Sequence, residues 1–185
     1  MTGYIGLGSN LGDRGAWLLR GLHGLRAAGI RITAASSLWE TEPVDTSAPG
    51  WFLNMVVETR TGREPLELLE ILLDVERQAG RRRDGRNGPR NLDLDLLLMG
   101  SRRWNDARLL LPHPRMWERS FVLEPLRQLA PELRNPLTGR TVAEECRRVA
   151  GRAVVREVGR LPLAGILRAS TPRSSSRDEV QIDRH

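Results

Sequence analysis

The most informative segment of this chain reads Leu92-Asp93-Leu94-Asp95-Leu96-Leu97-Leu98-Met99. Side chains alternate between the two faces of a β-strand, so the leucines at 92, 94 and 96 are predicted to share one face. Both carboxylates then share the other face, about 7 Å apart along the strand. The wholly apolar end favours a strand that is covered on both faces. A solvated sheet face would also explain the aspartates. At the mouth of a covered strand, however, they suit Mg²⁺, which takes a few carboxylate oxygens together with water and substrate phosphates.

A basic loop is predicted directly before this strand. Residues 81–90 read Arg-Arg-Arg-Asp-Gly-Arg-Asn-Gly-Pro-Arg, so arginines are interleaved with turn residues. Such a run is often only a solvated face. Beside a pair of metal-binding carboxylates, it favours a site for a polyphosphate, in which catalysis consists mostly of positioning and charge neutralisation.

The segments on either side predict a mixed fold. Strands are expected at Tyr4–Leu7, Ile30–Glu40 and Phe52–Thr59, besides the one at Leu92–Met99. A helix capped by Asp13 is expected to run to about Ala28, a second to run from Pro65 to Gly80, and a broken helix to span Met116–Ala130. Strand, helix, strand, strand, helix, strand is the order of an α+β fold, a ferredoxin-like α/β sandwich with an antiparallel sheet.

One folded domain and a tail are expected. Hydrophobic residues make up 39% of the 185 residues, enough for a core in one domain, which we expect to span residues 1–160. The composition shifts from about Leu161, and Arg168 to His185 carries serines, arginines and acids with almost no apolar residue, so residues 161–185 are expected to form a polar, flexible tail. Cys146, the single cysteine, is expected to be a small buried hydrophobe.

The basic residues are all arginines. The sequence contains 29 of them and no lysine, which excludes a Walker-type phosphate loop. Phosphate would therefore be held by guanidinium groups, whose planar fork suits nucleotides and nucleic acids alike. A compositional bias of the genome is the alternative explanation. No secretory signal or membrane-spanning apolar run is evident, so we expect a cytoplasmic protein without membrane contact.

His113 lies in the rigid bend Leu111-Pro112-His113-Pro114. A histidine in this position can be a proton or phosphate partner, or it can simply be hydrogen-bonded to the backbone. Arg108 and Arg119 flank the bend and could supply phosphate contacts. His23 and His185 receive no role.

Three motifs carry a resemblance to a known family. They are Gly8-Ser9-Asn10-Leu11 after a short strand, the turn Gly88-Pro89-Arg90 before the aspartate strand, and Pro112-His113 followed by Arg119 and Phe121. Together they resemble 6-hydroxymethyl-7,8-dihydropterin pyrophosphokinases, from about Tyr4 to Leu133. The motif from Gly88 to Asp95 is specific, because turn, arginine and alternating carboxylates occur in order.

The resemblance implies an ATP site. Asp93 and Asp95 would bridge two Mg²⁺ ions across the ATP phosphates. The expected catalytic residues are these two aspartates with the phosphate-clamping arginines Arg81, Arg83 and Arg90. Further ATP contacts are expected from Arg108, His113 and Arg119, with Glu76 supporting the nucleotide pocket.

The resemblance also implies a pterin site. The pterin ring would lie between Phe52 and Phe121, two residues that core packing alone could otherwise explain. Asn54 would read its polar edge, assisted by backbone groups at Thr41, Glu42 and Val44. The substrate hydroxyl would attack the β-phosphorus of ATP and release AMP, as a step of folate synthesis. No general base is assigned.

The sequence departs from the family pattern in places. Glu42 stands where some members have proline, Asn87 where some have tryptophan, and the arginine loop is one residue shorter. The pterin-stacking position is phenylalanine where tyrosine is frequent, a change that keeps the aromatic face.

Two other functions fit part of the pattern. An RNA-binding module would also combine a ferredoxin-like sheet with excess arginine, but it needs aromatic residues arrayed on central strands. A nucleotidyl-transfer enzyme with another acceptor would share the metal site. It would not need Asn54 and the two phenylalanines, which distinguish the two readings. We expect an enzyme that takes ATP and a small pterin, has no nucleic-acid partner and acts as a monomer.

Overall fold

An antiparallel sheet forms the centre of the structure, a computed structural model that describes residues 1–43, 50–80 and 90–167. Its strands are β1 (Thr2–Ser9), β2 (Arg31–Ala35), β3 (Leu38–Thr41), β4 (Phe52–Arg60), β5 (Asp93–Met99) and β8 (Val155–Gly159). They lie in the order β5-β1-β4-β3-β8, and β2 also pairs with β4. The small strands β6 (Trp104–Asn105) and β7 (Leu110–Leu111) form a separate hairpin. These strands all pair in the antiparallel sense, and the expected α+β class is confirmed.

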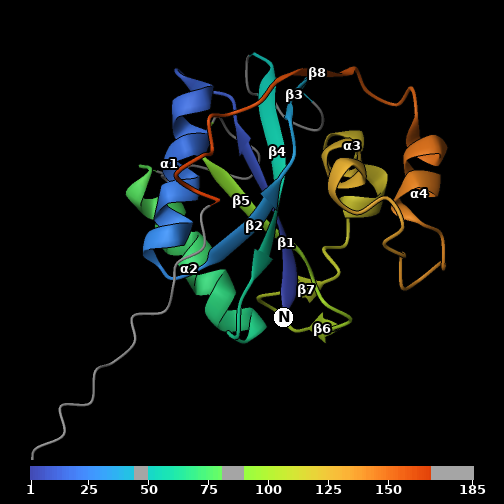
Figure 1. The fold of residues 1–185 in the computed structure, drawn as a ribbon. Helices are drawn as coiled ribbons and strands as arrows, with labels where there is room; N and C mark the ends of the chain where they lie inside the picture. Colours follow the sequence, from blue (N-terminus) through green and yellow to red (C-terminus); the bar gives the residue numbers. More distant parts are fainter. Residues whose placement is uncertain (44–49, 81–89, 168–185) are drawn as a thin grey trace, which may run out of the picture.

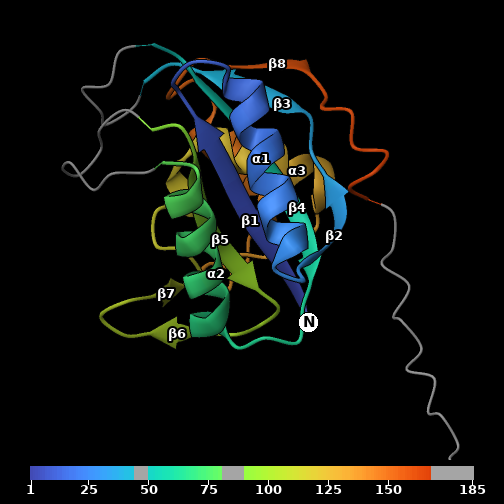
Figure 2. The same cartoon turned by 90° about the vertical axis from the view of Figure 1, so that its left-hand side faces the viewer.

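Helices cover both faces of the sheet. α1 (Arg14–Ala27) and α2 (Pro65–Gln78) lie on one face, while α3 (Ser120–Leu129) and α4 (Val142–Val149) lie on the other (Figure 1). A short 3₁₀ helix at Met116–Glu118 leads into α3. A quarter turn of the molecule shows α1 and α2 next to each other across the same face (Figure 2). None of the helices among the described residues is long and apolar enough to cross a membrane.

The two helices of the first face begin where the sequence predicts. Asp13 caps α1 by accepting a 3.0 Å hydrogen bond from the backbone N–H of Ala16. Pro65 is the first residue of α2, and Glu64 and Glu67 form a capping box around it. Gly80, with φ of +80°, follows the end of α2, in agreement with the predicted stop.

The sheet separates two hydrophobic cores. The first lies under α1 and α2 and contains Ile5, Met55 and Leu94. The second lies under α3 and α4 and contains Leu97 and Cys146. Cys146 is 4% exposed, so its predicted burial is confirmed.

The expected strand at Ile30–Glu40 is interrupted at Ser36 and Ser37. The Ser36 hydroxyl accepts a hydrogen bond from the backbone N–H of Val56, and the Ser37 N–H donates to the Gln128 side chain instead of to a strand. Two side-chain partners thus replace ladder bonds. β2 and β3 consequently pair with the same edge of β4 on either side of the break.

The C-terminal part of the described chain adds elements that the sequence did not predict. α4 packs on α3, and β8 forms the edge of the sheet beside β3. Residues 161–167, which fall in the expected tail, lie against the first core, and Ile166 is only 3% exposed. Residues 168–185 lie outside the described residues.

Candidate active site

The carboxylates of β5 lie on the opposite face from its leucines. Leu92, Leu94 and Leu96 belong to the first core, whereas Asp93 and Asp95 line a cavity on the other face. The predicted alternation is therefore confirmed. The two side chains are partly exposed, as a site that receives solvent or ligand requires.

The strand register aligns three residues across the floor of this cavity. Gly8 of β1 is paired with Asn54 of β4 on one side and with Asp93 of β5 on the other. Adjacent strands lie about 4.8 Å apart, so the backbones of Asn54 and Asp93 are roughly 10 Å apart. A Cβ added to Gly8 would lie 2.9 Å from Asn54 Oδ1, closer than atoms can normally approach. The glycine keeps the floor between the amide and the carboxylate open.

The cavity has a volume of about 230 Å³ and collects most of the residues that the sequence predicted. Predicted residues that line it are Thr41, Glu42, Phe52, Asn54, Arg90, Asp93, Asp95, His113, Arg119 and Phe121. They come from β3, β4, β5, the bend after β7 and the start of α3, so only the folded chain brings them together.

Some predicted site residues lie elsewhere. Glu76 is buried in α2, where its Oε1 accepts a 2.7 Å hydrogen bond from the backbone N–H of Leu94. Arg108 is exposed and paired with Glu70, and neither Glu76 nor Arg108 lines the cavity. Val44, Arg81 and Arg83 lie outside the described residues.

Arg90 is held on both its side chain and its backbone. Its guanidinium contacts Asp93 Oδ2 at 2.7 Å. Its backbone N–H donates to Asn10 Oδ1 at 2.7 Å, and its carbonyl accepts from the Asn10 N–H at 3.2 Å. Asn10 is 7% exposed, so this reciprocal pair is shielded from water. The sequence motif included Asn10, but its function in fixing Arg90 was not predicted.

His113 presents a neutral imidazole to the cavity. Its backbone N–H donates to the Leu97 carbonyl at 2.9 Å, which fixes the bend against β5. Its Nδ1 accepts from the Arg115 N–H at 3.3 Å, so the proton of the neutral ring belongs on Nε2. Burial, reinforced by the positive charge of Arg119, lowers the pKa of His113 to about 4, despite the opposing charge of Asp93. Near pH 7 this residue is therefore a hydrogen-bond donor without a charge.

Phe52 and Phe121 line the cavity from β4 and α3. Both are partly exposed, which distinguishes them from the fully buried core residues. The guanidinium carbon of Arg119 lies 5.4 Å from the centre of the Phe121 ring, a cation–π distance. Asn54 Nδ2 donates to Thr41 Oγ1 at 2.9 Å, which sets the orientation of the amide beside Phe52.

The donor set suits Mg²⁺ better than a metal that needs a full protein cage. Asp93 and Asp95 are neighbours on one strand face, and the described residues contain no group of three or more His, Cys, Asp or Glu able to hold a metal. Mg²⁺ is commonly bound by one or two carboxylates, with water and phosphate oxygens completing the octahedron. The two aspartates fit that requirement.

Sequence reasoning could have identified the role of Gly8 more fully. Glycine inside a strand often marks a place where a ligand or another chain segment approaches closely. Gly6 and Gly8 alternate within β1 and both line the cavity, opposite Asp95 and Asp93 in the register.

Comparisons with known proteins agree with this site. Residues 4–131 match the family described as 7,8-dihydro-6-hydroxymethylpterin-pyrophosphokinase. The 2-amino-4-hydroxy-6-hydroxymethyldihydropteridine pyrophosphokinase of Bacillus subtilis is 42% identical over 147 residues, which cover 79% of this chain and 88% of that protein. The enzyme of the same name from Methylorubrum extorquens is 43% identical over 142 residues, covering 76% of this chain and 89% of that protein.

A solved structure shows the same fold. The crystal structure of Plasmodium falciparum HPPK-DHPS wild type with pteroate superimposes with a TM-score of 0.63 over 82% of this chain, at 14% identity. The matched part is 44% of that longer chain. On the strength of the family match and the two bacterial relatives, this chain belongs to the 7,8-dihydro-6-hydroxymethylpterin-pyrophosphokinase family.

Proposed function

We propose that this chain transfers diphosphate from ATP to the hydroxymethyl group of 6-hydroxymethyl-7,8-dihydropterin and releases AMP, as a step of folate biosynthesis. The observation that carries the proposal is the row Asn54, Gly8, Asp93 across the cavity floor. It puts a group able to read a pterin edge roughly 10 Å from a group able to hold a metal. Membership of the pyrophosphokinase family supports both halves of the assignment.

The pterin is proposed to lie at the Asn54 end of the cavity. Phe52 and Phe121 would contact the faces of the ring. An amide carries two N–H donors and one acceptor, and the bond to Thr41 uses a single donor of Asn54. The remaining groups suit the donors and acceptors of an aminopyrimidinone edge. Backbone groups at Glu42 and Val44 are proposed to complete this pocket.

The ATP phosphates are proposed to lie at the Asp93 end. Asp93 and Asp95 would hold two Mg²⁺ ions, which when bound offset the negative charge that develops on the phosphate oxygens. Arg90 and Arg119 would contact the phosphates as cations, and His113 as a neutral donor from Nε2. Arg81, Arg83 and Arg108 are proposed as further phosphate contacts.

The reaction requires positioning more than covalent participation by the protein. The substrate hydroxyl oxygen forms a bond to the β-phosphorus, and the bond from that phosphorus to the oxygen bridging the α-phosphate breaks. AMP leaves with the bridging oxygen, and the hydroxyl proton passes to solvent. Glu76 is proposed to help by fixing β5, since its carboxylate holds the Leu94 N–H between the two aspartates.

We further propose that the protein acts as a cytoplasmic monomer.

The test is AMP release by the purified protein with ATP, Mg²⁺ and the pterin. The Asp95→Asn variant is expected to lose at least about 100-fold in kcat, because a metal carboxylate becomes a neutral amide. Asp74→Asn, at an exposed residue of α2 outside the cavity, is the matched control and is expected to retain activity. AMP release that does not depend on the pterin, or full activity of Asp95→Asn, would exclude the proposed reaction or its metal site.

A further inference from the structure

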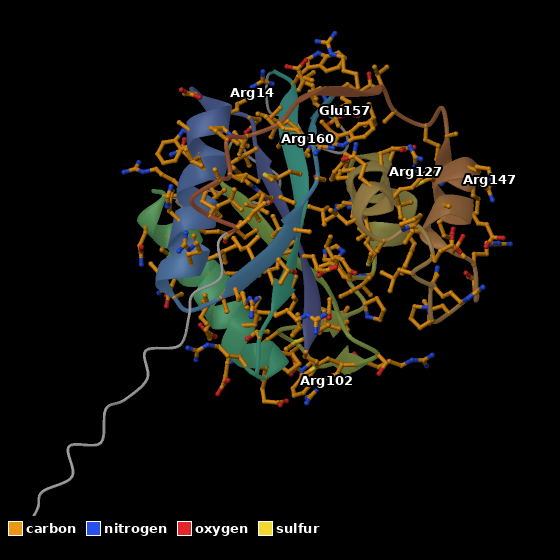
Figure 3. The ribbon with its side chains drawn as sticks, in the orientation of Figure 1. Arg14, Arg102, Arg127, Arg147, Glu157 and Arg160 are labelled. Carbon is orange, nitrogen blue, oxygen red and sulfur yellow. The ribbon has the colours of Figure 1, made fainter. Side chains whose placement is uncertain are left out.

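A cluster of charged residues lies behind the pterin side of the cavity, on the opposite face of the sheet. Arg14 Nη2 contacts Glu40 Oε1 at 2.7 Å, and Arg156 binds the other carboxylate oxygen through its Nε at 3.0 Å and through Nη2. These three residues line a second hollow, separate from the proposed active site. Arg14 lies at the same end of the molecule as β8, which carries Arg156 (Figure 3).

Strand alternation puts this cluster directly behind the cavity wall. Glu40 is paired across the strands with Leu53, a residue of the first core, so both point to the face covered by α1. The neighbouring pair, Thr41 with Phe52, points to the cavity. Any shift of Glu40 along or across the sheet would therefore also move Thr41.

The same arginines hold the start of β4. Arg14 Nη1 donates to the Trp51 carbonyl at 2.7 Å, and the Arg156 guanidinium carbon lies 4.9 Å from the centre of the Trp51 ring. Trp51 directly precedes Phe52. One cluster therefore ties together the strand end that carries Thr41 and the strand end that carries Phe52.

A further link runs from the C-terminal segment to β3. Val154 and Glu42 exchange two hydrogen bonds: the Val154 N–H donates to Glu42 Oε1 at 2.8 Å, and the Glu42 N–H donates to the Val154 carbonyl at 3.3 Å. A proline at position 42 would lack that N–H. β8 and Arg156 lie beyond residues 4–131, the part that matches the family. The part of the cavity wall formed by Thr41 and Phe52 is thus held by a C-terminal segment that lies outside residues 4–131.

The cluster remains charged at neutral pH. Hydrogen bonds from Arg156 and Arg14 hold the pKa of Glu40 below its usual value. The Glu40 side chain is 14% exposed, whereas those of Arg14 and Arg156 are 30% and 62% exposed, so water screens the Arg156 contact more than the Arg14 contact.

We infer that Arg14, Glu40 and Arg156 are positioning residues for the acceptor substrate: they set the affinity for the pterin by fixing Thr41 and Phe52 from behind, without contacting the pterin. The inference rests on the proposed function. It separates the two substrates, because the cluster supports β3 and the start of β4, whereas Asp93 and Asp95 lie on β5, beyond β1 in the sheet.

The first experiment measures KM for each substrate, kcat and thermal unfolding of Glu40→Gln and Arg14→Ala. We expect KM for the pterin to rise about tenfold, with kcat and KM for ATP changing less than about twofold, as expected when binding is lost equally in ground and transition states. Glu40→Gln keeps the size of the side chain and removes its charge, so the fold should persist.

Two matched variants separate positioning from general destabilisation. Glu145→Gln changes a buried carboxylate paired with Arg148 in α4, and Arg102→Ala removes an arginine paired with Glu64. Arg102 lies at the opposite end of the molecule from Arg14 (Figure 3). Glu145→Gln is expected to lower thermal stability, whereas Arg102→Ala, at an exposed ion pair, is expected to change it little. Both should leave KM for the pterin within about twofold, because neither adjoins the cavity wall.

A double-mutant cycle then tests whether Arg14 acts through Glu40. In the Glu40→Gln background, Arg14→Ala is expected to raise KM for the pterin by less than about threefold, because coupled residues do not add. If Arg14→Ala instead raised KM for the pterin by the same factor in wild type and in Glu40→Gln, the two effects would be independent. The cluster would then not act as a unit.

Direct binding distinguishes failure of the inference from failure of the proposed function. Calorimetry with the pterin, in the presence of Mg²⁺ and a non-hydrolysable ATP analogue, gives affinity without turnover. Wild-type protein that neither binds nor converts the pterin would overturn both. Wild-type activity with unchanged pterin affinity in Glu40→Gln, Arg14→Ala and Arg156→Ala would overturn the positioning role alone.

Discussion

At the scale of single residues, the cavity depends on Gly8 having no side chain. Gly8 lies between Asn54 and Asp93 in the register, and its Cβ position is only 2.9 Å from Asn54 Oδ1. An added methyl group must displace the amide, which is held by Thr41. The open floor and the orientation of the amide are therefore linked.

The Gly8→Ala variant is expected to raise KM for the pterin about tenfold or more, because a displaced amide no longer matches the pterin edge. Steady-state kinetics with varied pterin measure this. Gly6→Ala is the comparison, since its added Cβ would meet Leu97 at 3.6 Å, an ordinary contact. If Gly6→Ala proved as harmful as Gly8→Ala, the clash with Asn54 would not be the cause.

His113 is expected to make the protein sensitive to acid. Its folded pKa of about 4 lies below the value of about 6.5 in an unfolded chain. Between these values the unfolded chain binds a proton that the folded chain does not, so the free energy of unfolding falls as the pH drops from about 6.5 to 4. The total contribution is roughly 3 kcal/mol.

Urea unfolding at a series of pH values measures this effect. His113→Gln removes the titrating group and should give a shallower loss of stability, by up to about 1.4 kcal/mol per pH unit between pH 6 and 4.5. Identical pH slopes for wild type and variant would show that the pKa of His113 is not lowered in the folded protein.

The sequence identified most of the residues that line the cavity, but not the contacts that hold them in place. Alternation alone put Asp93 and Asp95 on one face, because that rule acts within a strand. The positions of Asn10 and Glu40 depend on which distant residues meet them, Arg90 and Arg156, and no local pattern specifies such contacts.

At the scale of elements, α2 and β5 are joined through a buried carboxylate. Glu76 is 1% exposed and accepts the Leu94 N–H at 2.7 Å. Removing the acceptor would leave a buried N–H unsatisfied next to both aspartates. Glu76 therefore contributes to the fold at the point where β5 carries the proposed metal site.

The Glu76→Leu variant is expected to lose about 2–4 kcal/mol in the free energy of unfolding, while Glu76→Gln, which keeps an acceptor oxygen, loses less. Chemical denaturation of both variants gives the comparison. Equal stability of Glu76→Leu and wild type would mean that the Leu94 N–H finds another partner.

Element boundaries were predictable where the chain signals them locally. Pro65 and Asp13 marked the starts of α2 and α1 because capping chemistry is local. The missed α4 also had such a signal, since Thr141 and Glu144 form a capping box. β8 had none: it is an exposed edge strand without alternation, stabilised by pairing with β3.

At the scale of the whole molecule, the end of the described chain returns to the core. Ile166 is 3% exposed and packs with residues of the first core, although it lies in a segment whose composition predicted a tail. The tail prediction rested on the polar composition of residues 168–185, and averaging over residues 161–185 hid the apolar run Leu161-Pro162-Leu163-Ala164-Gly165-Ile166-Leu167.

The Ile166→Ala variant is expected to lose about 2–4 kcal/mol of stability through the cavity it leaves. Leu167→Ala, at a residue that is 40% exposed, is the matched control and should change stability by less than about 1 kcal/mol. Thermal and urea unfolding of the full chain compare the two. Similar small losses in both would indicate that the segment 161–167 adds little to the fold.

The glycines of β1 at the centre of the cavity floor also affect how mutations could make this protein resistant to an inhibitor. A drug laid flat over β1 would rest on peptide groups and glycines, and backbone atoms stay the same whatever residue is encoded. A resistance mutation that adds bulk at Gly8 would crowd Asn54 as well as the drug. An inhibitor that contacts mainly the backbone of β1 should therefore be the hardest for this enzyme to escape by mutation.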